Sequence, residues 1–536
     1  MKRRVSVVLF ASVMLTCLVA CGKAKESDVV EQQTSENEIV NVVASENEVT
    51  EELSTNEVEA SSKIPVITFE TETKDFKAED GTVLLTGYFH YPVIKIEDNE
   101  AATTKIAEDI QKEKELYEQA FSDTLEIAKS DYEISKTDSE YVFQAYTLEY
   151  RFYVERTDEN IISLKEYFYN YTGGAHGNYG YWGLNYSVMT GQKLTMEDVA
   201  KDSKNFQESN LTYLLEEAKT PGYTNRLDVG FEGNFESMIL QEGKWYFSNS
   251  GMHFFANPYE LGCYAAGCIE FVIPYEDLSG LNETYSYKGN YQRRISVGEE
   301  ISKDINNDKK EEKVLYQVIS DGETGETQIT FTINGKDFSS ELVMESPYSD
   351  AYYIIDFDEN DDYMEIVLLD YGPSDDPMSN FYRYHTDGTL ESLGAVSDLF
   401  GNGTCYLESN GVLVGNTRLS LLQTWFAPAR WVLNKQMKFE KSKEARYIPD
   451  NMYQPKNPIL QPVFVYEKMD QNSSLVELKA EDGPVSFVAT DDEKWVELKT
   501  ADEKTYYLYM EDFETIASDG KSLLATSVFG DLTIAD

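Results

Sequence analysis

Two acidic loops carry the side chains whose types and spacing point most directly to chemistry. The segments ISVGEEISKDINNDKKEEKVLYQV and YYIIDFDENDDYMEIVLLDYG each read as a strand, an Asp/Asn-rich loop and a second strand. Oxygen-bearing side chains at alternate positions of a tight loop can converge on one hard cation, so a structural Ca²⁺ site is the functional interpretation. The expected ligands are Asp304, Asn306, Asp308, the carbonyl of Lys310 and Glu312 in the first loop, and Asp356, Asp358, Asn360, Asp362 and Glu365 in the second.

Neither loop is an EF-hand. In the first loop the sixth position is Lys309, where the sharp turn prefers glycine, and the twelfth is Leu315 instead of an acid. In the second loop the last acid is displaced by one residue. The alternative interpretation, that both loops are acidic surface turns, therefore stays open.

The histidines argue against a metalloenzyme. The chain has four, His90, His176, His253 and His385, and no two lie within a helical turn or two of one another. A local zinc-binding pair, a Gly-x-Ser-x-Gly elbow and a phosphate-binding glycine loop are all missing from the sequence. His176 in TGGAHGN is a candidate general base, but we favour a tight glycine turn that His176 closes by a hydrogen bond.

His253 follows the same logic as His176. A triad assembled over long range, or a cysteine paired with His176, remains open on sequence grounds. A non-enzymatic role is favoured.

The N-terminus has the layout of a secretory signal. Lys2, Arg3 and Arg4 precede an apolar run over residues 5–20, which is short for a transmembrane helix of about 20 residues. The sequence LVACG at residues 18–22, at the end of this run, resembles a bacterial lipobox, in which Cys21 is lipidated and becomes the first mature residue. We expect a lipid-anchored protein on the outer face of the cytoplasmic membrane, facing the cell wall.

Composition narrows the partners. With 46 basic and 96 acidic residues the formal net charge is −50, which excludes a nucleic-acid groove and suits either basic partners or plain solubility. Tyr, Phe and Trp make up 13% of the chain and cluster before residue 190, a pattern that suits sugar or protein recognition as well as core packing. Of the mature cysteines, Cys263 and Cys268 are close enough to pair and Cys405 is isolated, so no disulfide framework is expected.

The order of expected elements predicts an α+β protein. Strand formers at 82–96 precede a helix at 101–130, a hairpin follows at 141–155 and 161–171, and a second helix opens at Thr195 and runs to about Lys219. We expect a mixed helix and antiparallel-sheet N-terminal domain pair, followed by mostly-β C-terminal modules.

The segments at 171–200 and 245–278 give this N-terminal pair a family resemblance. They resemble the paired extracellular domains of unknown function of the PdaC/RsiV family, which occur beside a peptidoglycan deacetylase and as the outer part of a lysozyme-binding anti-sigma factor. The identifying residues are Gly173, Gly174, His176, Gly177, Pro274 and Tyr275. The resemblance implies extracellular binding, with lysozyme or another basic wall-active protein as a candidate ligand.

The C-terminal half resembles other extracellular modules. Asp304 and Asp356 lie 52 residues apart, a period that fits blade-like repeats, and their loops are similar to FG-GAP calcium loops. The stretch KWVELKTADEKTYYLYMEDF resembles the end of bacterial SH3-like domains, although Tyr506-Tyr507 stands where Gly-Trp is usual. The expected organisation is a signal and lipobox at 1–21, a disordered acidic linker at 22–63, α+β domains at 64–170 and 171–290, a β-rich region at 296–445 and an SH3-like domain at 455–536.

Binding is therefore the favoured function. We expect a lipoprotein that captures or senses a cell-envelope ligand, either a lysozyme-like protein or peptidoglycan. A wall-modifying hydrolase using His176 and a structural envelope protein are the alternatives.

Overall fold

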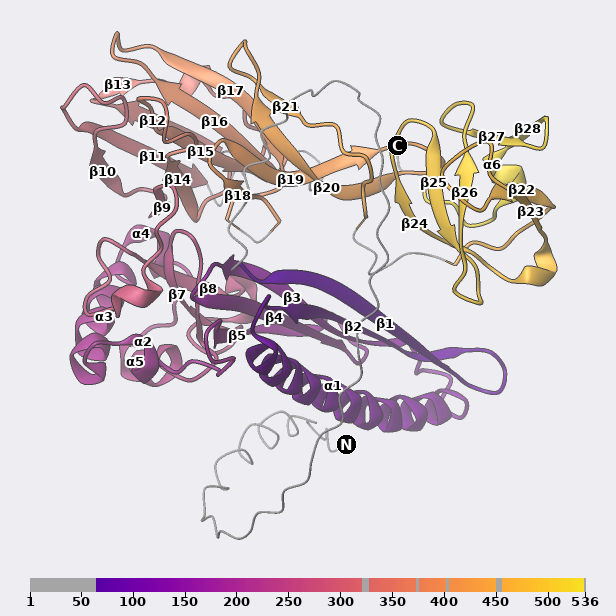
Figure 1. Ribbon diagram of the computed structural model, residues 1–536. Helices are drawn as coiled ribbons and strands as arrows, with labels where there is room; N and C mark the ends of the chain where they lie inside the picture. Colours follow the sequence, from indigo (N-terminus) through magenta and orange to yellow (C-terminus); the bar gives the residue numbers. More distant parts are fainter. Residues whose placement is uncertain (1–63, 321–326, 373–375, 402–403, 450–455, 535–536) are drawn as a thin grey trace, which may run out of the picture. The chain divides into compact units, whose positions relative to one another are not determined.

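The computed structural model describes residues 64–320, 327–372, 376–401, 404–449 and 456–534. All of these residues belong to one compact unit. The signal, Cys21 and the expected linker lie outside the described residues. Over the described ranges the fold is mostly β with fewer helices and several antiparallel sheets, which confirms the broad class (Figure 1). No helix in those ranges is long and apolar enough to span a bilayer.

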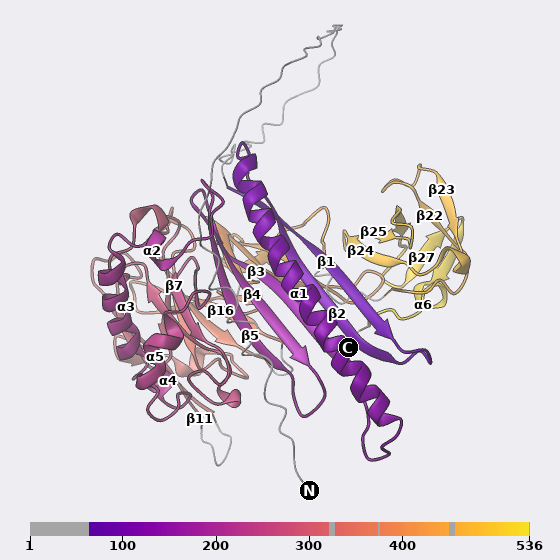
Figure 2. The ribbon, with the colours of Figure 1, turned by 90° about the horizontal axis from the view of Figure 1, so that it is seen from below.

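A five-stranded sheet with one long helix opens the described chain. Its strands lie in the order β1-β2-β3-β4-β5, and every neighbouring pair is antiparallel except β2 and β3. The parallel pair is possible because α1 connects the two strands and crosses one face of the sheet (Figure 2). The elements are β1 (Val66–Lys77), β2 (Val83–Lys95), α1 (Glu100–Ser135), β3 (Tyr146–Thr157), β4 (Ile161–Tyr171) and β5 (Asn178–Ser187).

The helix and hairpin expected from sequence are both present. The Asn99 side chain caps α1 by accepting from the amide of Ala102. A stripe at helical spacing, which includes Ile106, Ile110 and Tyr117, is buried against the sheet. Strand β5 pairs with β4 along its whole length, so the first sheet runs to Ser187 and passes the expected domain boundary at residue 170.

The next region packs helices on a three-stranded antiparallel sheet ordered β6-β7-β8. Its elements are α2 (Met196–Val199), α3 (Ser203–Glu217), α4 (Pro221–Thr224), α5 (Glu232–Ile239), β6 (Trp245–Phe247), β7 (Gly251–Ala256) and β8 (Ile269–Pro274).

The single helix expected from Thr195 to Lys219 is wrong, because the structure divides it into α2 and α3. Thr195 forms the capping box expected of it with Asp198. Ala200 then turns to an extended conformation and bridges to Leu281, and the Asp202 side chain caps α3. The bridge between Ala200 and Leu281 and the Asp202 cap together stabilise a break in the helix at this point.

The first sheet and the three-stranded sheet meet at a backbone contact between β5 and β6. The amide of Gly183 donates to the carbonyl of Gly243 at 2.7 Å. The hydroxyl of Ser163 accepts from the amide of Phe247 at 2.8 Å and donates to the Asn185 side chain at 2.7 Å. A β-carbon on Gly183 would lie 2.0 Å from the carbonyl oxygen of Trp245, so only glycine allows this approach.

The C-terminal half is built from antiparallel strands. A nine-stranded sheet has the path β21-β20-β19-β17-β16-β15-β14-β9, with β18 paired to β19, and a four-stranded sheet has the order β10-β11-β12-β13. Their strands are β9 (Gln292–Ser296), β10 (Glu300–Lys303), β11 (Glu312–Ser320), β12 (Thr327–Ile333), β13 (Lys336–Asp337), β14 (Ala351–Ile355), β15 (Glu365–Asp370), β16 (Met378–Tyr384), β17 (Leu390–Ser397), β18 (Tyr406–Ser409), β19 (Val412–Leu419), β20 (Trp425–Leu433) and β21 (Phe439–Lys441).

A five-stranded sheet ordered β23-β22-β26-β25-β24, a β27-β28 hairpin and a short helix complete the described chain. These elements are β22 (Val463–Tyr466), β23 (Leu475–Leu478), β24 (Ser486–Thr490), β25 (Trp495–Lys499), β26 (Thr505–Tyr509), β27 (Thr515–Ser518), β28 (Lys521–Leu524) and α6 (Ala525–Val528).

Replacing Gly183 tests whether the β5–β6 contact is structurally required. We expect Gly183→Ala to destabilise the protein by about 1–3 kcal/mol, because the methyl group overpacks against backbone that has no rotamer to change. Urea unfolding followed by circular dichroism measures the change. Gly233→Ala in α5 is the control, because nothing lies within 4 Å of its added methyl group. Equal stability of the two variants would contradict a required close approach.

Candidate binding site

Tyrosines gather on the face of the first sheet opposite α1. Side chains alternate along β4, so Leu164 packs into the core beneath α1 while Tyr167 and Tyr169 point to the other face. Tyr167 lies opposite Tyr181 of β5, and Tyr169 lies opposite Tyr179. All four side chains are half-buried.

Three of these rings, those of Tyr167, Tyr179 and Tyr181, are in mutual contact, and the contacts continue onto the loop before β8. The centroid of Tyr167 is 5.5 Å from that of Tyr181 and 6.2 Å from that of Tyr179. Tyr179 is in turn 5.9 Å from Tyr264. Burial raises the pKa of Tyr167 and of Tyr181, so both hydroxyls remain neutral donors. We call Tyr167, Tyr169, Tyr179, Tyr181, Tyr259, Tyr264 and His176 the tyrosine face.

The glycine turn of the family motif closes the end of this face. Gly173 and Gly174 have φ values of +82° and +106°, which favour glycine. The Nδ1 atom of His176 lies 2.9 Å from the carbonyl oxygen of Gly177, and its ring stacks on Tyr264 at 3.9 Å. The Tyr264 hydroxyl donates to the same carbonyl at 2.7 Å. His176 thus contacts the backbone of its own turn and the ring of Tyr264.

Tyr259 is the most exposed tyrosine of the tyrosine face. Its side chain is 63% exposed and its ring centroid lies 5.6 Å from that of Tyr264. The backbone of Tyr259 has φ +73°, a left-handed conformation that a residue with a large side chain rarely adopts. Its amide donates to the carbonyl of Gly262, which closes the loop. Strain of this kind concentrates at functional sites.

The other two motif residues, Pro274 and Tyr275, have structural roles. Pro274 ends β8 opposite Gly251. The hydroxyl of Tyr275 donates to the carbonyl of Ser248 at 2.7 Å and accepts from Arg156 at 2.6 Å. Burial raises the pKa of Tyr275 to about 12 although Arg156 acts to lower it. Pro274 and Tyr275 therefore support the sheet without belonging to the tyrosine face.

The structure also reveals a buried serine and histidine beside a half-buried carboxylate, which sequence reasoning did not bring together. The Ser248 hydroxyl lies 2.7 Å from Nε2 of His253, and Nδ1 of His253 lies 3.5 Å from a carboxylate oxygen of Glu270. This order resembles the arrangement of a serine hydrolase. Ser248 is only 7% exposed and His253 only 1%, so a substrate cannot reach the hydroxyl. The turn between β6 and β7 was the one sequence signal that could have paired Ser248 with His253.

Glu270 also belongs to a wider set of charged side chains that are buried or half-buried. The Tyr246 hydroxyl donates to its carboxylate at 2.5 Å. Burial acts to raise the pKa of Glu270, but nearby His253, Lys165 and Arg294 hold that pKa below its usual range. Lys165 pairs with Glu155 at 2.7 Å. Burial acts to lower the pKa of Lys165, yet Glu155 and Glu270 keep its ammonium charged.

In the first acidic loop most of the expected ligands accept hydrogen bonds from backbone amides of the loop itself. Asp304 accepts from the amide of Lys309, Asn306 from that of Asp308, Asp308 from that of Lys310, and Glu312 from that of Ile305. One carboxylate oxygen of Asp304 is buried and has no hydrogen-bond partner.

The second acidic loop is built differently. Glu365 is fully buried and forms an ion pair with Arg383, which also pairs with Asp361 at 2.9 Å. One carboxylate oxygen of Asp356 is buried without a partner. Asp358 accepts from the amide of Asn360 at 3.1 Å.

The two acidic loops contact each other, since Asn307 donates to Asp362 at 2.6 Å. Over the described ranges no group of three or more His, Cys, Asp or Glu side chains is arranged to hold a metal.

The three cysteines of the described residues form no disulfide with one another. Cys263 is exposed, Cys268 is half-buried and Cys405 is buried. Burial raises the pKa of Cys268 and of Cys405, so neither is a ready thiolate nucleophile.

Comparison with known proteins agrees with this N-terminal architecture. Residues 51–179 match the family described as deacetylase PdaC, and residues 197–276 match a family described as protein of unknown function, DUF3298. No curated protein matches the chain.

Two solved structures of DUF3298 proteins are similar to the chain. One is from Bacteroides fragilis, at 20% identity and a TM-score of 0.30, covering 41% of this chain and 96% of that one. The other is from Pseudomonas aeruginosa, at 13% identity and a TM-score of 0.25, covering 41% and 95%.

The two family matches identify the class of the N-terminal region, whose PdaC-like domain is of extracellular type. More particularly, it holds a PdaC domain followed by a DUF3298 domain. The tyrosine face draws on both, because β4 lies in the first match and Tyr259 and Tyr264 lie in the second.

Removing His253 tests whether the group of Ser248, His253 and Glu270 is structural. We expect His253→Ala to cost about 1–3 kcal/mol of stability, because it deprives Ser248 and Glu270 of a buried partner. Thermal or urea unfolding measures this, with the more exposed His385→Ala as the control. A fluorophosphonate reagent applied to the native protein should leave Ser248 unmodified, and labelling at Ser248 would instead reveal a working nucleophile.

Proposed function

We propose that the protein is an extracytoplasmic, membrane-anchored lipoprotein whose PdaC and DUF3298 domains capture a cell-envelope ligand on the tyrosine face. The ligand is a lysozyme-like protein or peptidoglycan. The observation that carries the proposal is Tyr259, an exposed ring held outward by a strained backbone beside the stacked Tyr264 and His176. The lipid anchor at Cys21 is proposed from the lipobox.

Aromatic rings of this kind suit capture of a protein or a sugar. Tyrosine offers a large rigid surface with a polar tip, and such residues dominate the binding energy of many interfaces. The net charge of −50 favours rapid association with a basic protein such as lysozyme. The FG-GAP-like and SH3-like regions are proposed as a spacer or a second binding site.

Titration of the full chain with lysozyme by calorimetry, at low and at physiological salt, tests the proposal. We expect saturable binding that survives physiological salt, because ring contacts are not screened as charges are. Tyr259→Ala should weaken binding by about 2 kcal/mol, or roughly 30-fold, as loss of a central ring does.

The controls separate this outcome from its alternatives. Tyr406→Ala removes an exposed ring from β18, outside the matched domains, and should leave affinity unchanged. Binding seen only at low salt, or an equal loss of affinity in both variants, would mean that lysozyme is attracted only by the overall negative charge. Peptidoglycan fragments would then be titrated next. A hydrolase that uses His176 would instead lose turnover in His176→Ala with binding retained, and a structural protein would show neither effect.

A calcium-binding role for the first acidic loop is a second proposal. The partnerless buried oxygen of Asp304 is the observation that favours it, since such an oxygen is costly unless it meets a hydrogen or a cation. Burial raises the pKa of Glu312, and the nearby Asp308 and Asp304 raise it further, so a cation would relieve repulsion there. In the second loop Arg383 already neutralises Glu365. The first loop is therefore the better candidate.

Calcium titration followed by melting temperature tests this second proposal. We expect Ca²⁺ to raise the melting temperature, because a ligand that binds only the folded state stabilises it. EGTA should reverse the shift and Asp304→Asn should abolish it. Asp387→Asn, in an exposed turn, is the control. An unchanged melting temperature at millimolar Ca²⁺ would leave both loops as acidic surface turns.

A further inference from the structure

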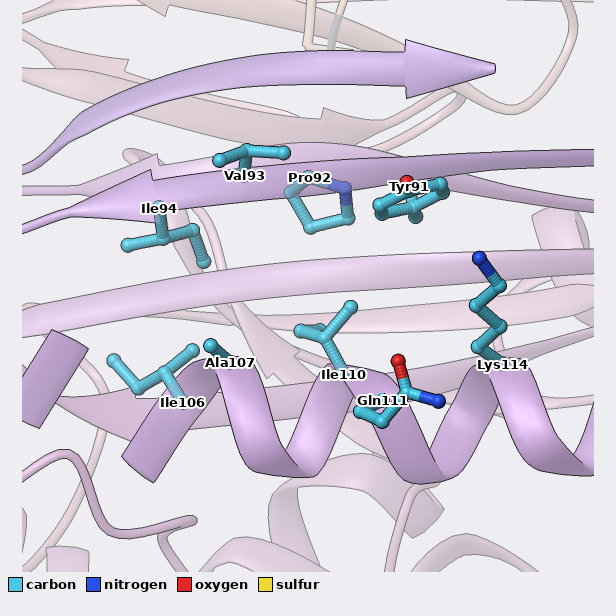
Figure 3. Close-up of a pocket in the computed structure, with 9 residues that line it drawn as sticks. All are labelled: Tyr91, Pro92, Val93, Ile94, Ile106, Ala107, Ile110, Gln111 and Lys114. Carbon is cyan, nitrogen blue, oxygen red and sulfur yellow. The ribbon is translucent and has the colours of Figure 1, made fainter. Parts of the chain in front are cut away.

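A small polar cavity lies beside the buried charges of β4 and β8. Its volume is about 150 Å³, and its walls include Lys165, Tyr181, Cys268, Glu270, Arg294 and Asp350. It is unlike the apolar hollow of about 220 Å³ between β2 and α1, where Ile94 lies toward Ile106 and Ile110 (Figure 3). The polar cavity has room for several water molecules or one small polar molecule.

Two of the four charged side chains that line the cavity already form ion pairs within the protein. Lys165 pairs with Glu155, whose side chain is 2% exposed, at 2.7 Å. Asp350 pairs with Arg226 at 2.6 Å. These two pairs have no charge left to offer a ligand.

Arg294 and Glu270 are different. Among the ion pairs of the described residues none includes Arg294, and its one short polar contact is with the Tyr223 hydroxyl at 3.5 Å. Glu270 is held by Tyr246 and faces His253, but its side chain remains 29% exposed and lines the cavity. The cavity therefore presents one guanidinium and one carboxylate that do not pair with each other.

We propose that this cavity binds the zwitterion of a small α-amino acid. Arg294 would take the α-carboxylate, which a guanidinium can hold by two parallel hydrogen bonds, and Glu270 would take the α-ammonium group. A simple anion would satisfy Arg294 and leave Glu270 repelled, and a simple cation would do the reverse. The four charged side chains that line the cavity sum to zero charge, so the cavity favours a ligand that carries one positive and one negative charge.

Tyr181, Phe255 and Tyr348 complete the walls and limit the ligand's side chain. The cavity volume favours alanine or glycine over larger amino acids. The proposal does not depend on capture by the tyrosine face, so either can fail while the other stands.

Calorimetric titration of the full chain with glycine, L-alanine and D-alanine tests the proposal. Alanine amide lacks the carboxylate and N-acetylalanine lacks the ammonium group, and the latter also imitates the end of a peptide. We expect saturable binding of at least one free amino acid and at least about tenfold weaker binding of both analogues, because each loses a charge-assisted contact. Absence of saturable binding by all three free amino acids, or equal binding of N-acetylalanine, would overturn the proposal.

Two variants locate the binding. Arg294→Gln and Glu270→Gln should each weaken it by at least about tenfold. Arg293→Gln is the matched control, because this neighbouring arginine of β9 pairs with Glu276 and Asp277 outside the cavity. Affinity unchanged by Arg294→Gln would place the ligand elsewhere and overturn the assignment. If a variant fails to fold, as judged by circular dichroism, the analogue series on the unaltered chain decides.

Discussion

The contact between β5 and β6 is the constraint on which the N-terminal half depends. A sheet edge with free amides and carbonyls must be paired or covered, and here the edge strand of the first sheet is met by the backbone of the next region. Gly183 permits the approach, and Ser163 and Asn185 satisfy the polar groups enclosed by it. The PdaC and DUF3298 domains are joined here by hydrogen bonds as well as by sequence. A surface that uses rings from both can therefore keep a fixed geometry.

Much of the fold was accessible from sequence because its signals are local. The helix at α1 follows from the spacing of Ile106 and Ile110, and the β3–β4 hairpin follows from alternation. The glycines before His176 have left-handed φ values, and the His176 ring lies against its own backbone. The break between α2 and α3 was not foreseen, because it depends on the bridge between Ala200 and Leu281, which lie far apart in the chain.

The chemistry of the interior was harder to foresee. Ser248 and His253 are five residues apart, but Glu270 joins them only through the pairing of β7 with β8. Arg294 of β9 lines the same polar cavity as Glu270, and nothing in its local sequence distinguishes it from Arg293. Periodicity predicts which face a side chain occupies, but it does not predict which distant charges that face will meet. The acidic loops show the converse, since their composition was evident while their use as backbone braces required the structure.

Tyr259 has a consequence for the thermodynamics of any interface it enters. A tyrosine on a flexible loop loses backbone and rotamer freedom when a partner orders it, and that loss opposes association. The backbone of Tyr259 is fixed by its hydrogen bond to Gly262, and its ring already contacts that of Tyr264. Folding has therefore met most of the entropic cost in advance, and the ring can slow dissociation without first having to be ordered.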